Sequence, residues 1–295
     1  MKNLSRCLAM AVCGMAFLAL AGCATVPLTD RSQLALVSNE QLVQLGMQSY
    51  QEVLKTSQLS TNLAEVDLVN RVGVRLARAT EQYLMSLYYP SREFAWEFNV
   101  IEDDAMVNAW CLPGGKVAVY TGLFPVAKTE EGLAVVLAHE IAHVVANHGN
   151  ERMSEAMLVE MGGQALAVAM QQRPAQTQNM FMRSYGLVSQ TGVLLPHSRR
   201  QESEADRIGL TLMAAAGYNP QEAVGLWERM AAASGDTPRA MAFLSTHPAP
   251  SQRIENIQAH LPEAMAIYSG PPPSGPPAAP SGGQGFNVRT NTYRK

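Results

Sequence analysis

The 295-residue sequence has few cysteines, no run of basic residues, and no apolar stretch beyond its N-terminus long enough to cross a bilayer. The lack of basic runs argues against nucleic-acid binding. The lack of later apolar spans disfavours a membrane-embedded protein. The four cysteines are Cys7, Cys13, Cys23 and Cys111. Three of them therefore lie in or at the end of the N-terminal segment.

That N-terminal segment has the pattern of a secretion signal. Two basic residues precede an apolar stretch from Leu8 to Leu20, which has the length of a signal peptide and is short for a bilayer span. The stretch leads into Leu-Ala-Gly-Cys23, which resembles a bacterial lipoprotein signal with cleavage before Cys23 and lipidation of its thiol. We therefore expect residues 1–22 to be a signal peptide. The resemblance implies a chain that is lipid-anchored in the bacterial cell envelope, on the periplasmic face of the outer membrane.

This interpretation leaves Cys111 as the one cysteine of the mature chain that is not lipidated. No intramolecular disulfide can then form, even in an oxidising compartment. We expect Cys111 to be a small buried hydrophobic residue. A nucleophilic role would need an activating base, and the sequence identifies none.

The most informative motif is His139-Glu-Ile-Ala-His143. Residues four apart lie about 40° apart around a helix, so both imidazoles share one face. Two such nitrogen donors can bind one Zn²⁺, and Glu140 can act as the base that takes a proton from water. The segment 132–146 around the motif is otherwise apolar, which indicates a buried helix. Burying these three polar groups without partners would cost several kcal/mol, and a bound metal removes that difficulty.

A catalytic zinc site usually takes three protein ligands, so a further ligand is needed. His148 lies nine residues after His139 and points to the opposite side of the helix. We expect it to be a surface or capping histidine near the helix end, without a ligand role. Downstream, a helix starting near an N-cap at Ser198 carries several carboxylates. Glu202 is the preferred ligand and Glu204 the alternative on a different face.

Asp206 lies four residues after Glu202 and shares its face. It can orient a ligand histidine through a hydrogen bond from behind the metal.

The sequence resembles a known protease family at four motifs that occur in the family's order. These are Asn108-Ala-Trp-Cys-Leu-Pro-Gly-Gly115, the His-Glu-Ile-Ala-His motif, Ser198-Arg-Arg-Gln-Glu-Ser-Glu-Ala-Asp206, and Ser245-Thr-His-Pro with Arg253. They resemble the HtpX and CAAX prenyl endopeptidase family of zinc metalloproteases, of the gluzincin type. Within it, the chain is similar to the soluble periplasmic lipoprotein branch that includes BepA and LoiP. The match runs from about Gln33 to Leu261.

The resemblance implies roles for individual residues. The ligands of one Zn²⁺ per chain would be His139, His143 and Glu202, and the base would be Glu140. His247 would stabilise the oxyanion or, as in the BepA type, occupy the open zinc position and hold the enzyme inactive. Arg253 would anchor the loop that carries His247.

A substrate-binding strand is also expected. Asn108 and the backbone of Ala109, Trp110 and Cys111 would form an edge strand that binds an extended peptide by β-augmentation.

The fold expected is α+β, mainly α, with a zincin-like domain at 23–268 and a small β-sheet beside the His-Glu-x-x-His helix. Strands are predicted at 94–101, 105–111 and 116–120, and helices from residue 39 onward and over 63–87. For 154–171 we favour a core helix over a mobile amphipathic lid lying on the cleft or a membrane. The Pro/Gly-rich residues 269–295 are predicted to be a disordered tail.

These features together predict a zinc-dependent endopeptidase that degrades unfolded or misassembled envelope proteins. The expected partners are those substrates, the membrane through lipidated Cys23, and the outer-membrane assembly machinery. The alternative is an assembly factor or chaperone for outer-membrane proteins whose protease site is gated or rarely used.

Overall fold

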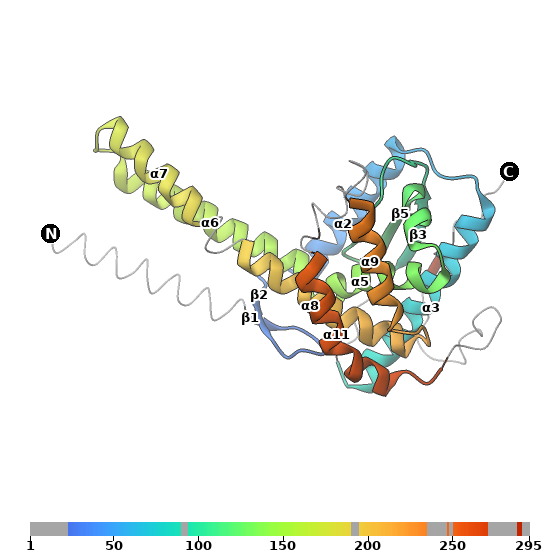
Figure 1. The fold of residues 1–295 in the computed structure, drawn as a ribbon. Coiled ribbons are helices and arrows are strands. Elements are labelled where there is room, and N and C mark those ends of the chain that lie inside the picture. Colours follow the sequence, from blue (N-terminus) through green and yellow to red (C-terminus); the bar gives the residue numbers. More distant parts are fainter. Residues whose placement is uncertain are drawn as a thin grey trace. The chain divides into compact units, whose positions relative to one another are not determined.

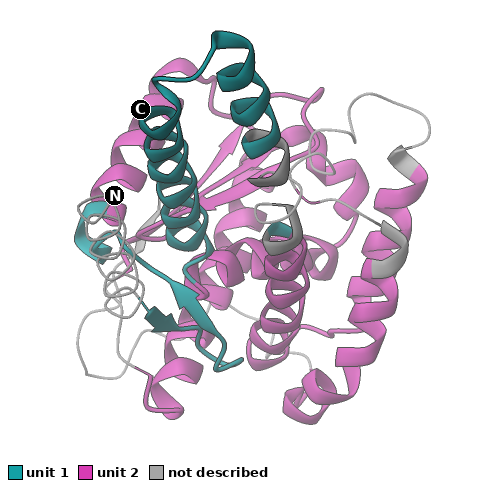
Figure 2. Cartoon of the chain, turned by 90° about the vertical axis from the view of Figure 1, so that its left-hand side faces the viewer, with its two compact units in different colours: residues 1–41, 147–198 teal, residues 42–146, 199–295 magenta. Residues whose placement is uncertain are grey.

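The computed structural model describes residues 23–89, 94–189, 195–234, 247, 250–270 and 288–290. The predicted signal peptide, residues 1–22, lies outside the described residues. Helices predominate and the strands form two small sheets (Figure 1), which confirms the α+β, mainly α class. The chain divides into two compact units, one of residues 1–41 and 147–198 and the other of residues 42–146 and 199–295 (Figure 2). None of the described helices is both long and apolar enough to cross a membrane.

The first unit combines a β-hairpin with a helical hairpin. Its elements are the antiparallel strands β1 (Cys23–Thr25) and β2 (Ser32–Leu34), and the helices α6 (His148–Met170) and α7 (Ala175–Ser189). Arg31 forms a bidentate ion pair with the buried Glu151 of α6, in which Nη1 donates to Oε1 at 2.6 Å and Nη2 donates to Oε2 at 2.7 Å. The backbone amide of Leu36 donates to Ser154 Oγ at 2.8 Å. The first two turns of α6 are therefore fixed to the β-hairpin.

Two expectations for this region are wrong. His148 is fully buried rather than on the surface. The helix predicted over 154–171 forms, but it is no core helix, because no side chain from Ala156 to Met170 is buried. An apolar composition alone cannot tell a core helix from an exposed one.

The second unit contains a four-stranded sheet in the order β4-β5-β3-β6. Its strands are β3 (Trp96–Ile101), β4 (Ala109–Leu112), β5 (Lys116–Tyr120) and β6 (Val288–Thr290). β4 and β5 form an antiparallel hairpin, whose turn contains Gly114 and Gly115 at φ values of +86° and +81°. Glycine adopts this backbone conformation without the strain that a side chain brings. β4 is an edge strand, as predicted.

β6 lies inside the segment 269–295 that we predicted to be a disordered tail. It pairs in parallel with β3, with Val288 opposite Trp96 and Thr290 opposite Phe98. The prediction therefore does not hold for residues 288–290. Residues 271–287 and 291–295 lie outside the described residues.

Helices surround the sheet of the second unit. They are α2 (Asn39–Thr56, which begins in the first unit), α3 (Leu63–Ser86), the 3₁₀ turn η1 (Thr121–Leu123), α4 (Phe124–Ala127), α5 (Glu130–Val145), α8 (Leu195–Ala215, also beginning in the first unit), α9 (Glu222–Ser234) and α11 (Pro250–Ile267). α8 begins three residues before the predicted start at Ser198. α3, β4 and α9 all pack against α5, which makes α5 the central helix of this unit.

The sequence of α5 explains both its start and its burial. Thr129 caps the helix by accepting a hydrogen bond from the Gly132 amide at 3.0 Å, and Glu130 and Glu131 place negative charge in the first turn. Both features stabilise a helix N-terminus. Every residue from Gly132 to His143 is buried, so the helix carries its polar motif into the protein interior.

Candidate metal centre

Helix α8 approaches α5 closely at a glycine. A Cβ atom at Gly209 would lie 3.2 Å from the backbone N and Cα atoms of His139, a contact tighter than side chains normally tolerate. Gly209 therefore lets the two helices pack with little space between them. This packing brings Glu202 and Asp206, one helical turn apart on α8, up to the histidines of α5.

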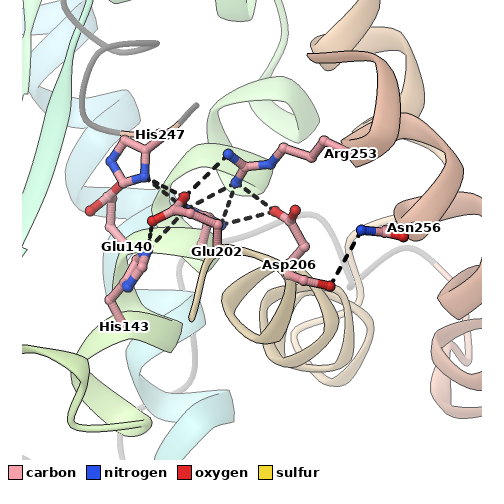
Figure 3. Close-up of polar contacts among 9 residues, drawn as sticks. Glu140, His143, Glu202, Asp206, His247, Arg253 and Asn256 are labelled. Atoms are coloured by element: carbon pink, nitrogen blue, oxygen red, sulfur yellow. Dashed lines mark hydrogen bonds and ion pairs between the residues drawn. The ribbon is translucent and has the colours of Figure 1, made fainter. Parts of the chain in front are cut away.

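Four side chains converge in the interior of the second unit (Figure 3). One donor atom from each of His139, His143, Glu202 and His247 lies within 4.8 Å of the others, and all four residues are buried. The Nε2 atoms of the two α5 histidines are 3.1 Å apart. Glu202 Oε2 is 3.3 Å from His139 Nε2, and Glu202 Oε1 is 3.3 Å from His143 Nε2.

These distances fit a single metal ion. Two ligand atoms bound at 2.0–2.2 Å in a tetrahedral zinc site lie about 3.3–3.6 Å apart. The three spacings of 3.1–3.3 Å among His139, His143 and Glu202 are close to this value. Glu202 Oε1 and Glu140 Oε1 are buried and accept no hydrogen bond among the described residues. Buried oxygens without hydrogen bonds are expected where a metal and its water would bind.

The electrostatics of the cluster also favour a cation. Burial raises the pKa of the Glu202 carboxyl, but contacts with His139, His143 and His247 lower this pKa by a larger amount. The net pKa is therefore well below its usual range. Burial and the charge of Arg253 lower the pKa of His139, whereas Asp206 and Glu202 raise it more, to about 9. The site is thus arranged to hold positive charge beside Glu202.

Behind the cluster, Asp206 links a ligand histidine to an arginine. Asp206 Oδ1 lies 3.0 Å from His139 Nδ1 and accepts a hydrogen bond of 2.6 Å from Arg253 Nη2. Arg253 Nη1 also donates to Glu202 Oε2 at 3.3 Å, as Figure 3 shows. The Arg253 guanidinium stacks on the Trp227 ring, 3.6 Å from its centroid. The sequence pattern does not single out Trp227, because an aromatic residue on an amphipathic helix is indistinguishable from an ordinary core residue.

His247 is the fourth residue of the cluster. Its Nδ1 is 2.7 Å from Glu202 Oε2 and 3.2 Å from His139 Nε2. Its Nε2 is 3.3 Å from Glu140 Oε1. The side chain therefore stands between the expected metal position and Glu140.

The structure places the other predicted site residues as follows. Among the described residues, the cluster includes Glu202 and leaves out Glu204, the alternative ligand. β4, with Ala109, Trp110 and Cys111, packs against α5, and Asn108 immediately precedes it. Cys111 is half-buried, and burial together with the Glu140 charge raises the pKa of its thiol well above the ordinary value. Its thiol is therefore kept protonated, which argues against a nucleophile.

A buried helix with two histidines, a buried carboxylate from a later helix within 3.3 Å of both, and a small sheet alongside define a metallopeptidase of the zincin type. The sequence profile of peptidase family M48 matches residues 71–261, and the chain belongs to this family.

Named relatives agree with that assignment. The chain is 46% identical over 173 residues to the mitochondrial metalloendopeptidase OMA1 of Schizosaccharomyces pombe, covering 59% of this chain and 49% of that protein. It is 32% identical over 253 residues to the Saccharomyces cerevisiae protein of the same name, covering 82% and 70%. It is 28% identical over 243 residues to the beta-barrel assembly-enhancing protease of Escherichia coli, covering 79% and 46%. The chain thus spans about half the length of the first and third of these relatives.

The comparisons also correct the sequence analysis. The narrower assignment to the HtpX and CAAX branch is not confirmed, because the more similar relatives are OMA1 proteins. The bacterial envelope location is contradicted, since the similar OMA1 proteins from yeasts, a plant and mammals are named as mitochondrial. Lipidation of Cys23, which is exposed, is untested by these findings and stays a prediction.

Proposed function

We propose that this chain is a zinc-dependent endopeptidase that cleaves unfolded or misassembled proteins. The observation that carries the proposal is the convergence of His139, His143 and Glu202 at ligand spacing, with Glu140 buried next to the first histidine. The family assignment supports hydrolysis of peptide bonds. The relatives are named as a metalloendopeptidase and as an assembly-enhancing protease, and these names support an endopeptidase.

In this proposal each residue has a defined task. Bound Zn²⁺ supplies Lewis acidity and lowers the pKa of water toward ~7. Glu140 accepts a proton from the attacking water and delivers it to the leaving amine. Asp206 fixes the ring orientation of His139 through Nδ1, and Arg253 holds Asp206 in place. The edge strand β4 binds the substrate as an added, extended strand.

The purified chain is expected to contain about one zinc per molecule and to cleave unfolded casein. A chelator should remove the metal and stop cleavage, and added Zn²⁺ should restore it. Metal content is measured by elemental analysis and cleavage by appearance of casein fragments. A chain that binds zinc but leaves casein intact contradicts the endopeptidase, and a chain that cleaves casein without metal contradicts the metal site.

A second function, a chaperone or assembly factor with a gated protease site, is favoured by the position of His247. At 2.7 Å from Glu202 Oε2, the ring takes the place where a substrate carbonyl would approach the metal. A deletion strain complemented by wild-type chain or by Glu140→Gln separates the two functions. Full rescue by the inactive variant would mean that binding, and not cleavage, is the main activity.

His247→Ala is expected to raise the rate of peptide hydrolysis about tenfold. The reason is that the imidazole no longer competes with water and substrate for the fourth coordination position of the metal. Zinc content should not change, since His139, His143 and Glu202 remain. Steady-state hydrolysis of a fluorogenic peptide measures the effect. His260→Ala is the matched control, because His260 lies on the same helix as Arg253 and near Glu263 at the surface. A rate that falls below wild type would instead assign His247 to oxyanion stabilisation.

A further inference from the structure

The helical hairpin of α6 and α7 contains a long segment without a buried core. No side chain from Ala156 to Tyr185 is buried. The two helices are nevertheless joined in a defined way, because Tyr185 donates a hydrogen bond to the carbonyl oxygen of Val159 at 2.8 Å. A Cβ atom at Gly162 would lie 2.3 Å from the Tyr185 hydroxyl, so a larger residue there would displace the Tyr185 side chain from this position. The hairpin is a formed structure that leaves its outer surface to solvent.

That outer surface is apolar along one side of α6. Met153, Met157, Met161 and Val168 are exposed by 38%, 43%, 51% and 63% of their surface. At about 100° per residue, these four positions fall within an arc of roughly 80°. Further exposed apolar side chains of the hairpin are Leu158, Met180 and Phe181. A helix normally turns such a stripe toward a core, whereas here it faces outward and marks a binding surface.

The charges of the hairpin indicate what binds there. Between Ala156 and Ser189 the chain has two basic side chains, Arg173 and Arg183, and one acidic side chain, Glu160. The whole chain has a net charge of −3, so this segment has the opposite sign from the rest. An apolar helical stripe combined with basic side chains suits the interface of an anionic lipid membrane.

We propose that residues 153–189 dock on an anionic lipid surface, with the stripe of Met153, Met157, Met161 and Val168 inserted at the interface and Arg173 and Arg183 facing the lipid headgroups. This docking is independent of peptide hydrolysis. It would concentrate the chain on membranes whether or not the metal centre is active.

Hydrogen–deuterium exchange of the full chain tests the proposal locally. Vesicles of phosphatidylcholine containing phosphatidylglycerol are expected to slow amide exchange in α6 and α7 about tenfold, because exchange requires local opening that docking opposes. Pure phosphatidylcholine vesicles should give much weaker protection. The double variant Met157→Glu/Met161→Glu should lose the protection, since it replaces two stripe residues with negative charge.

The matched control is Leu63→Glu/Met85→Glu on α3. These residues are exposed by 65% and 66%, so the control introduces the same charge at comparable apolar positions of the other compact unit, and protection should persist. The proposal is overturned by unchanged exchange with both vesicles, or by equal protection from both. Protection that rises with protein concentration without lipid would identify a second copy as the occupant. Protection only by unfolded casein would identify a polypeptide, and either result overturns docking on lipid.

Discussion

Glu140→Gln is expected to lower kcat/KM for casein or a fluorogenic peptide by about 10²–10⁴-fold, the usual contribution of a general base. The amide has nearly the same volume as the carboxylate but cannot accept the proton of water. The side chain is buried, and its Oε1 accepts no hydrogen bond among the described residues. That oxygen lies 3.3 Å from His247 Nε2, and the amide of glutamine can keep this contact. Zinc content should remain at the wild-type level, because Glu140 is not a member of the four-residue cluster.

A neighbouring carboxylate on the same helix provides the control for this prediction. Glu131 lies in the first turn of α5 and is exposed, so Glu131→Gln makes the same chemical change two and a half turns away from Glu140. It should hydrolyse substrate at close to the wild-type rate. Wild-type activity in Glu140→Gln, with zinc bound, would refute the assignment of the base and with it the mechanism.

Much of the metal centre could be predicted because helical spacing places its residues on shared faces. The four-residue spacings of His139 with His143, and of Glu202 with Asp206, need only the helix repeat. The choice of Glu202 over Glu204 was less certain from sequence. It depends on how α8 is rotated against α5, and the close approach at Gly209 sets that rotation.

Other features depend on tertiary contacts that no local pattern records. The Pro-Gly-Gly turn predicted the β4–β5 hairpin correctly because turn residues act locally. The pairing of Val288 with Trp96 joins residues almost two hundred positions apart, and nothing in the Gly/Pro-rich sequence before it indicates that partner. The exposure of α6 was missed for a similar reason, since its apolar residues predict burial only when a partner surface exists.

The contacts of Arg253 are a further example of tertiary contacts that the local sequence pattern does not predict. Its position in the late motif suggested a loop anchor. The loop-anchoring role stays a prediction, and the structure adds that the guanidinium stacks on Trp227 and donates to Asp206 and Glu202. One cation thus offsets the negative charge of two buried carboxylates. A metal centre that needs two acidic side chains in the interior requires such a counter-charge, and the sequence could not pair it with either carboxylate.

Glu202→Ala is expected to abolish stoichiometric zinc binding. It removes one of three ligands together with the negative charge that attracts the cation, and the two remaining imidazoles are neutral donors. Replacing a residue that hydrogen-bonds to a ligand typically lowers metal affinity by roughly 10–100-fold. Asp206→Asn should lower zinc affinity by that amount, and Glu202→Ala should lower it more. Competition with a chromogenic zinc chelator measures all of these affinities.

Glu204→Ala distinguishes loss of a ligand from loss of a buried carboxylate on α8. Glu204 is buried, at 8% exposure, but lies outside the ligand cluster. Its replacement should leave zinc affinity close to wild type, even where it changes the temperature of unfolding. Unchanged zinc content in Glu202→Ala would remove this residue from the ligand set. Loss of zinc in Glu204→Ala, but not in Glu202→Ala, would mean that α8 presents its other face to the metal. Because α8 approaches α5 closely at Gly209 and Glu202 lies within 3.3 Å of both histidines, we expect Glu202→Ala to lose zinc and Glu204→Ala to keep it.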